Sequence, residues 1–304
     1  MIVARLQGGM GNQMFQYALA RRLAAERGTE VGLDLTTLLD RTPHPDFVFR
    51  DYDLDLFKVR ARVLAEGELR GVVAVPRGRL LNRREVTPHL NRWRRFWSRD
   101  AYLLVKERGF GFDPEVLALE GNLYLDGYWQ APRYFAPIAG ALVADFALQE
   151  PLPARVQELG DRIGALNSLC INVRRADFVA LAAAARLHGA CDRDYFERAL
   201  AAIVPRIGAP EIFVTSDDVP WCRENLRFGH PTTFLDHDWA GPRFSHYLAL
   251  MVRCRHFIIP NSTFAWWAAW LSTSPGKVVV APQVWFRGLP AEGADLLPAE
   301  WLRV

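Results

Sequence analysis

The sequence predicts a parallel α/β fold of two domains, on the strength of three observations. Short apolar runs that read as buried strands alternate with segments of helical periodicity. A polar stretch with two prolines, residues 149–153, has the composition of a linker. The length of 304 residues suffices for two domains and a large core. We therefore expect domains over residues 1–150 and 151–304.

The first half begins with an apolar run over residues 2–6 that predicts a strand. A glycine-rich turn over residues 7–13 follows it. Apolar side chains then recur at helical spacing up to a glycine that suits a helix end, namely Phe15, Ala18, Leu19, Leu23 and Gly28. The other elements expected here are strands over 31–35 and 122–126 and a helix over 134–148. Residues 42–120 show no clear periodicity.

The second half alternates more regularly. We expect strands over residues 169–173, 211–215, 232–235, 256–259 and, as the last of the series, 277–281. We expect helices over about 195–204 and 244–254, near Trp221, and from Ser262 onward. This alternation predicts a doubly wound parallel sheet, in which ligands bind at the carboxyl ends of the strands.

The composition is that of a soluble globular protein. Half of the residues are hydrophobic, 23% are charged and the formal net charge is +3. No apolar run approaches the roughly 20 residues that a membrane span requires, and no signal-peptide pattern is present. The four cysteines have neither zinc-ligand nor disulfide-framework spacing, and they are Cys170, Cys191, Cys222 and Cys254. We therefore expect a cytoplasmic protein.

One segment, residues 77–99, concentrates arginines and interleaves them with tryptophan and phenylalanine. A solvated surface segment is one interpretation. The other is a dock for an anionic acceptor or a membrane surface, which would place the protein at the inner face of the membrane. A nucleic-acid partner is not expected, because no binding motif of that class accompanies the segment.

The strongest site signal is the pair Arg174 and Arg175, directly after the buried strand expected over residues 169–173. Guanidinium groups at the mouth of a buried strand are costly unless an anion meets them, and their planar fork suits phosphate oxygens. An ion pair with Asp177 is the structural alternative. At the carboxyl end of a strand, we expect the pair to bind a diphosphate.

The turn over residues 7–13 reads Gln-Gly-Gly-Met-Gly-Asn-Gln. Glycines between a strand and a helix let backbone amides approach a ligand, and the helix N-terminus favours negative charge. The turn lacks the lysine of a P-loop. A plain tight turn, with Asn12 as the helix N-cap, is the alternative.

Two further segments place polar side chains at expected strand ends. Residues 215–218 read Thr-Ser-Asp-Asp, where Asp217 can accept hydrogen bonds from guanine while one of the two acids caps the next helix. Residues 260–271 begin with Pro-Asn-Ser-Thr, so Asn261, Ser262 and Thr263 open a helix at an anion site. The aromatic stripe in that helix, which consists of Trp266, Trp267 and Trp270, is expected to be core.

No metal site is expected, because arginines and a helix N-terminus can hold a diphosphate without a metal ion. The seven histidines are scattered and form no pattern with a serine or cysteine nucleophile. The residues thus favour an anion-binding site rather than a hydrolytic one.

With these segments assembled, the chain resembles the α-1,2-fucosyltransferase family, glycosyltransferase family 11. The first matching segment reads Gly-Gly-Met-Gly-Asn-Gln-Met-Phe-Gln-Tyr-Ala from position 8. The segments that carry the resemblance are residues 8–18, 127–130, 174–177, 216–218 and 261–271, in family order over nearly the whole chain.

The resemblance implies a GT-B fold, in which two Rossmann-like domains face each other across a cleft. The N-terminal domain is then the acceptor side, and the C-terminal domain binds GDP-L-fucose, with no metal and no cofactor besides this donor. An arginine of the pair binds the β-phosphate, and fucose is transferred with inversion. The implied donor-binding residues are Gly9, Gly11, Asn12, Gln13, Asn172, Arg174, Asp217, Asn261, Ser262 and Thr263. The implied catalytic residues are Arg174, Arg175, Asp177 and Asp126.

The chain departs from the family at position 172, where Asn172 stands in place of the usual histidine. Asparagine keeps hydrogen-bonding capacity but does not titrate near neutrality, so a guanine contact survives and a proton-transfer role does not. Ala176 and Phe178 replace a usual glycine and tyrosine.

The implied acceptor is an oligosaccharide or lipid-linked glycan, with O2 of a terminal galactoside as the expected position. Asp177, Asp126 and Asp34 fall at expected strand ends and are the candidates for a general base. Two alternatives remain: a transferase that uses another GDP-linked 6-deoxyhexose, and a module that binds a GDP-sugar or glycan without turnover.

Overall fold

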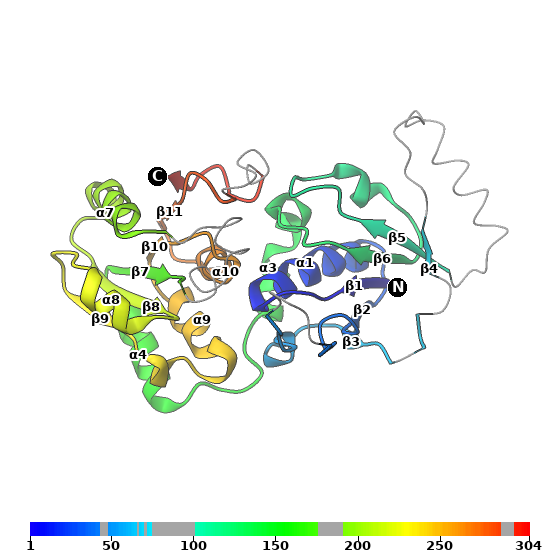
Figure 1. Cartoon of the computed structure of the whole chain (residues 1–304), viewed down its shortest axis with the longest axis horizontal. Coiled ribbons are helices and arrows are strands. Elements are labelled where there is room, and N and C mark those ends of the chain that lie inside the picture. The colour runs from blue at the N-terminus through cyan, green and yellow to red at the C-terminus, as the bar shows by residue number, and fades with distance from the viewer. Residues whose placement is uncertain (43–47, 66, 70–71, 75–100, 176–190, 287–294) are drawn as a thin grey trace.

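Two parallel sheets face each other in the computed structural model, which describes residues 1–42, 48–65, 67–69, 72–74, 101–175, 191–286 and 295–304 (Figure 1). The N-terminal sheet has the strand order β3-β2-β1-β6-β5-β4, and the C-terminal sheet has the order β12-β11-β10-β7-β8-β9. All neighbouring strands in both sheets pair in parallel. The polar ends of the strands in each half can therefore meet at one edge.

The N-terminal sheet is built around β1, whose apolar residues are buried between neighbouring strands and α1. Its strands are β1 (Ile2–Arg5), β2 (Val31–Asp34), β3 (Arg62–Val63), β4 (Val72–Ala74), β5 (Tyr102–Lys106) and β6 (Leu123–Asp126). Its helices are α1 (Met10–Glu26) and α3 (Ala139–Asp145), with 3-10 turns η1 (Leu54–Leu56), η2 (Pro114–Ala118), η3 (Pro132–Tyr134) and η4 (Ala136–Ile138).

The C-terminal sheet is built around β7, in which all six residues are buried, as expected for a central strand with helices on both faces. Its strands are β7 (Ser168–Val173), β8 (Glu211–Ser216), β9 (Thr232–Phe234), β10 (His256–Ile258), β11 (Val279–Ala281) and β12 (Leu302–Arg303). Its helices are α4 (Ala154–Ala165), α7 (Arg193–Ile207), α8 (Val219–Asn225), α9 (Ser245–Val252) and α10 (Thr263–Leu271), with 3-10 turns η5 (His237–Trp239) and η6 (Pro242–Phe244).

Most expected elements are present within a residue or two of their predicted ends, and three expectations are wrong. Residues 134–148 do not form one helix, because Pro137 interrupts the segment and the chain passes through η3 and η4 before α3. The strand over 277–281 is not the last, since the two-residue β12 follows it. Asn12 is not the N-cap of the first helix, because α1 begins at Met10 with Gly9 in that position.

The two halves meet where α1 packs against α10 (blue and orange near the centre of Figure 1). Phe15 of α1 lies 4.6 Å from the ring of Trp266 and 4.9 Å from that of Trp267. The Trp267 indole nitrogen donates to the Gly11 carbonyl at 2.9 Å. Trp266 and Trp267 are buried, which confirms the tryptophan stripe as core, and one hydrophobic cluster runs through both halves.

Within the described ranges, no helix is both long and apolar enough to cross a bilayer. The arginine-rich segment over residues 77–99 lies outside the described residues. The domain boundary at residues 150 and 151 stays a prediction, and it falls between α3 and α4.

Candidate active site

A cavity of about 670 Å³ lies between the two halves and is lined by residues of both. Its volume falls in the range of small-molecule sites, which is about 300–1,000 Å³. Nine of the sequence-predicted residues line it, and they are Gly9, Gly11, Asn12, Asn172, Arg174, Asp217, Asn261, Ser262 and Thr263. The structure thus brings together segments that are up to about 250 positions apart in the sequence, as residues 9 and 263 show.

Arg174 follows the last residue of β7 and lines the cavity. Its Nη1 lies 2.8 Å from Oδ2 of Asp217, which follows the neighbouring strand β8. The backbone N–H of Arg175 donates to the other Asp217 oxygen at 2.9 Å. Asp217 therefore holds Arg174 in place at the strand ends, and its predicted guanine contact stays a prediction.

Arg175 has a different environment from Arg174 and does not line the cavity. Its guanidinium carbon lies 3.7 Å from the ring centroid of Trp221 on α8, and its Nε is 3.6 Å from Asp218. Asp218 also caps α8 by accepting from the Trp221 N–H at 3.2 Å, which confirms that one acid of this pair is a cap. The structure thus distinguishes the two arginines, since this stacking turns Arg175 toward α8, and the catalytic role expected for Arg175 stays a prediction.

Asn172, which stands at the usual histidine position, is 6% exposed and lines the cavity. Its Nδ2 donates to Thr215 Oγ1 at 2.9 Å across the β7–β8 pair. This bond fixes the orientation of the Asn172 side-chain amide at the cavity wall.

Two helix N-termini reach the cavity side by side. Gly9 is the N-cap of α1 and Ser262 is the N-cap of α10, and neither makes a side-chain capping hydrogen bond. Gly11 permits the close approach, because a Cβ at that position would lie 2.5 Å from the Thr263 backbone. Backbone N–H groups and helix dipoles at these ends favour an anion in the cavity.

Asn261 also lines the cavity, two residues before the start of α10. It is 4% exposed, and its Nδ2 donates to the Trp285 carbonyl at 3.3 Å. The interaction joins the start of α10 to a segment beyond β11, so the position of Asn261 is fixed by tertiary contacts.

A turn from the N-terminal half, residues 127–130, contributes Tyr128 and Gln130 to the cavity. Trp129 between them has a φ of +58°, which is strained for a bulky residue. Glu107, just beyond β5, holds this turn by accepting the N–H groups of Tyr128 at 2.6 Å and Trp129 at 2.8 Å. Burial raises the pKa of Glu107 to about 7, while the two N–H donors act in the opposite direction.

Sequence reasoning gave Glu107 no role, because it lies in the stretch without clear periodicity. Its position directly after an apolar run, Tyr102–Lys106, is the signal that could have found it. Gln130 donates to Asn12 at 2.9 Å, and its buried Oε1 has no hydrogen-bond partner among the described residues. A substrate hydroxyl would satisfy this oxygen.

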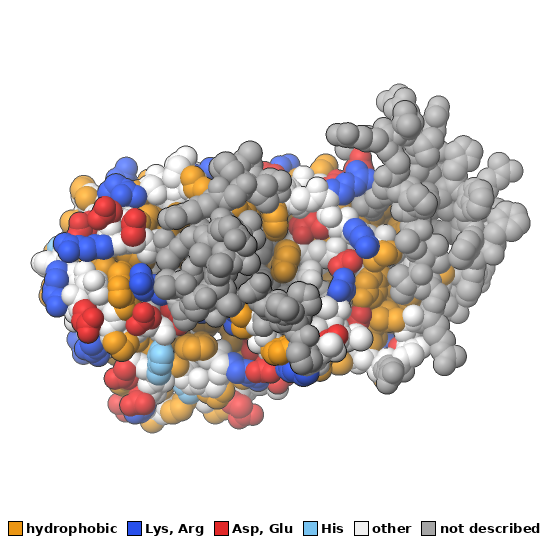
Figure 2. All heavy atoms as spheres, viewed as in Figure 1, with side chains coloured by type: hydrophobic (Ala, Val, Ile, Leu, Met, Phe, Trp, Pro, Cys, Tyr) orange, Lys and Arg blue, Asp and Glu red, His pale blue; other side chains and the backbone are white. Residues whose placement is uncertain are grey.

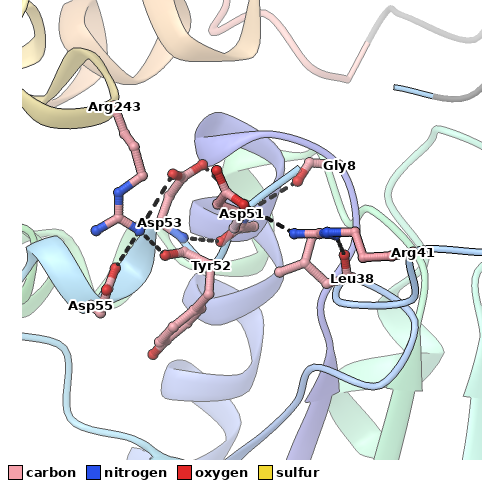
Figure 3. Close-up of polar contacts among 9 residues, drawn as sticks. Gly8, Leu38, Arg41, Asp51, Tyr52, Asp53, Asp55 and Arg243 are labelled. Atoms are coloured by element: carbon pink, nitrogen blue, oxygen red, sulfur yellow. Dashed lines mark hydrogen bonds and ion pairs between the residues drawn. The ribbon is translucent and has the colours of Figure 1, made fainter. Parts of the chain in front are cut away.

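An acidic run, Asp51-Tyr52-Asp53-Leu54-Asp55, was also missed, and two of its residues line the cavity. Figure 3 shows the polar contacts of this run with Arg41 and Arg243. Asp51 and Asp53 line the cavity, whereas Asp55 binds Arg243 of the C-terminal half at 2.8 Å. Burial raises the pKa of Asp53 to about 6, with Arg243 acting to lower it. The alternation of three aspartates is a sequence signal that could have found this run.

Gln13 is buried and connects the acidic run to the start of α1 rather than lining the cavity. Its Oε1 accepts the Asp53 N–H at 2.9 Å, and its Nε2 donates to the Asp51 carbonyl at 2.8 Å. Gln13 is therefore a positioning residue for residues 51–53. Its expected direct contact with the donor stays a prediction.

Of the remaining expected acids, the two that the structure describes, Asp126 and Asp34, do not line the cavity. Asp126 ends β6 and forms an ion pair with Arg5 at 2.8 Å, and Asp34 accepts from Tyr124 at 2.5 Å. The pKa of Asp34 is lowered: its burial acts to raise the pKa, but hydrogen bonds from Thr36 and Tyr124 outweigh that burial. Asp177 lies outside the described residues, as do Ala176 and Phe178.

Acidic and basic side chains are interspersed over the described part of the C-terminal half on the face that Figure 2 shows. In the part of the chain that is described, no group of three His, Cys, Asp or Glu side chains could hold a metal ion.

The family model and the relatives that match this chain all describe glycosyltransferases. The family model "Glycosyl transferase family 11" matches residues 97–301. An alpha-1,2-colitosyltransferase of Escherichia coli is 28% identical over 100% of this chain and 98% of its own length. The O-antigen biosynthesis glycosyltransferase WbnK of Escherichia coli is 26% identical over 93% of this chain and 94% of its own length.

Among solved structures, a mutant of Arabidopsis thaliana FUT1 in complex with GDP has a TM-score of 0.50 at 10% identity. The match covers 91% of this chain and 69% of that one. This likeness concerns the fold, and together with the two facing parallel sheets it confirms the expected GT-B architecture.

Proposed function

The chain belongs to glycosyl transferase family 11, and on this premise we propose that it transfers L-fucose from GDP-L-fucose to a glycan hydroxyl. The proposed acceptor position is O2 of a terminal galactoside. The observation that supports the proposal is that Arg174 and the N-termini of α1 and α10 line one cavity. This set of groups is suited to a diphosphate.

The proposed reaction is one in-line displacement with inversion. The acceptor oxygen bonds to the anomeric carbon while the bond from that carbon to the β-phosphate oxygen breaks. Negative charge then grows on the β-phosphate, where Arg174 and the N–H groups of α1 and α10 can stabilise it. Asp217 contributes by holding Arg174 at 2.8 Å before the donor binds.

A metal ion is not part of this proposal, since guanidinium and helix N-termini supply the positive charge. Transfer should then proceed at the same rate in the presence of a chelator such as EDTA. A lipid-linked glycan remains a proposed acceptor, with the segment over residues 77–99 as the proposed membrane contact.

Two observations, one from the sequence and one from the comparisons, support a donor other than GDP-L-fucose. Asn172 replaces the usual histidine, and a full-length relative carries the name colitosyltransferase. The second candidate function is therefore transfer of a related deoxyhexose from its GDP-linked form. Asn172 lines the cavity and is the residue at which the donor site differs from the family pattern.

The test is to incubate the purified protein with several GDP-sugars and a panel of small galactosides, and to measure GDP release and product linkage. We expect release that depends on both substrates, with an α-1,2 linkage in the product. Binding of a GDP-sugar without any release of GDP would instead identify a non-catalytic binding module.

A further inference from the structure

The proposed transfer releases a proton from the acceptor hydroxyl, and a carboxylate in the cavity is a suitable recipient. Among the residues that the structure describes, the carboxylates that line the cavity are Asp51, Asp53 and Asp217. The earlier candidates Asp126 and Asp34 lie outside it. The choice of a base thus depends on how these three side chains are held.

Two of the three are poorly suited to take a proton. Asp217 is engaged by the Arg174 guanidinium at 2.8 Å through Oδ2 and by the Arg175 N–H at 2.9 Å through Oδ1, so both of its oxygens already have close partners. The Asp51 side chain is 70% exposed and pairs with Arg41 at 3.0 Å, so solvent surrounds it. The Asp53 side chain is 12% exposed and lies at the cavity wall.

The position of Asp53 is fixed by its backbone and by Gln13. Its N–H donates to Gln13 Oε1 at 2.9 Å, and Gln13 Nε2 lies 3.0 Å from the Gly8 carbonyl and 3.4 Å from Asp53 Oδ2. Asp53 occupies the N-cap position of η1 without using its carboxylate to cap that turn. Asp53 Oδ2 thus lies near Gln13, while Oδ1 has Arg243 at 3.9 Å, which is beyond hydrogen-bond distance and leaves Oδ1 able to accept a proton.

Arg243 approaches the same carboxylate without neutralising it at close range (Figure 3). Its Nη1 is 3.9 Å from Asp53 Oδ1, but only 2.8 Å from Asp55, and it also donates to the Tyr52 carbonyl. Its closer partner is thus Asp55.

The cavity beside Asp53 also presents aromatic side chains suited to a sugar. Phe49 is 40% exposed and Phe244 is 41% exposed, and both line the cavity. Exposed aromatic rings in a cavity offer apolar faces to a ligand, while polar neighbours fix its orientation. Asp53 therefore lies where an acceptor glycan, rather than the nucleotide phosphates, has matching groups.

We propose, resting on the transferase function argued above, that Asp53 is the general base that receives the proton of the acceptor hydroxyl. As the acceptor oxygen bonds to the anomeric carbon, its proton passes to Asp53 Oδ1. The electron pair of the breaking carbon–oxygen bond leaves with GDP. Asp53 then returns the proton to solvent.

The acid–base properties of Asp53 fit this role. Burial raises its pKa to about 6, and four charged groups face it: Arg243 and Arg50 lower the pKa, while Asp51 and Asp55 raise it. A base with this pKa is ionised at neutral pH and close to the optimum for proton transfer. Below about pH 6 it is protonated and inactive.

The experiment compares Asp53→Asn with Asp51→Asn, which removes an equal charge two residues away in the same cavity wall. We expect Asp53→Asn to lower kcat for transfer about 100-fold while the Kd for GDP changes less than twofold. The acid limb of kcat/KM near pH 6 should disappear in Asp53→Asn and persist in Asp51→Asn. Asp53→Glu should restore the limb.

The proposal is overturned if Asp53→Asn keeps the wild-type kcat and acid limb, or if its loss of kcat is matched by loss of GDP binding. Loss of the limb in both asparagine variants would also overturn it. These outcomes are distinct from failure of the transferase function, in which the wild-type protein itself releases no GDP with any donor and acceptor pair.

Discussion

The two walls of the cavity differ in charge and in how they are built. The C-terminal wall carries Arg174, hydroxyl groups and the N-terminus of α10, all directly after strands β7, β8 and β10. The N-terminal wall carries the α1 N-terminus, but its side chains include carboxylates, an amide and aromatic rings from loops, among them Asp53, Gln130 and Phe49. One wall is thus suited to an anion, and the other can also accept protons and hold a sugar.

This difference suggests a division of labour across the cleft. In the proposed reaction, groups that follow the central strand β7 and its neighbours would meet the negative charge that develops on the leaving diphosphate. Loop residues, which are held by Gln13 and by Glu107, would meet the proton and the acceptor. Loops that a rigid scaffold positions are where binding specificity commonly lies, so acceptor choice should depend on the N-terminal wall.

The largest effect should come from Arg174→Ala in the C-terminal wall. Arg174 lines the cavity, and removing one positioned donor to developing charge typically costs about 10²–10³ in kcat. We expect a loss of this size in the rate of GDP release from the donor, while thermal unfolding changes little.

Arg175→Ala is the matched control for that prediction. Because its guanidinium stacks on Trp221 and lies outside the cavity, we expect kcat to fall much less and the unfolding temperature to fall more. Equal losses of kcat in both variants, without unfolding, would show that the distinction between the two arginines is wrong.

The C-terminal wall was largely predictable from the sequence, and the N-terminal wall was not. Arg174 directly follows an apolar, β-branched run and Ser262 lies three residues after another, so their place at a sheet edge follows from strand periodicity. Asp53 and Glu107 lie in a stretch where strands are two to five residues long and give weak periodicity. Their role depends on tertiary contacts that local sequence does not encode.

The same reasoning applies to the arginine pair. From the sequence, Arg174 and Arg175 are equally good candidates for the phosphate contact, because they are adjacent and of the same residue type. Both arginines follow the end of β7, so strand periodicity does not decide which of them lines the cavity. Only the packing of Arg175 on Trp221 shows which arginine is left for the cavity.

An intermediate effect, on stability, is expected where the two walls touch. A Cβ at Gly11 would lie 2.5 Å from the Thr263 backbone, which cannot move aside without shifting α10. We expect Gly11→Ala to lower the free energy of unfolding by about 1–3 kcal/mol, as overpacking does in other cores. Urea denaturation followed by tryptophan fluorescence would measure this.

Gly9→Ala is the control for stability, because its φ of −78° suits any residue and a Cβ there would meet nothing within 4 Å. We expect its free energy of unfolding to stay within about 0.5 kcal/mol of wild type. If Gly11→Ala were equally stable, the close contact between α1 and α10 would not be a constraint on the cleft.

The smallest effect should be a shift in pH dependence when the link between the walls is removed. Arg243 of the C-terminal half lowers the pKa of Asp53, so Arg243→Gln should raise that pKa above about 6. A carboxylate with a higher pKa stays protonated to higher pH, so the acid limb of kcat/KM should move upward, with activity at pH 8 less affected than activity at pH 6. A limb that moves downward, or stays in place, would mean that Arg243 does not act on the group that titrates.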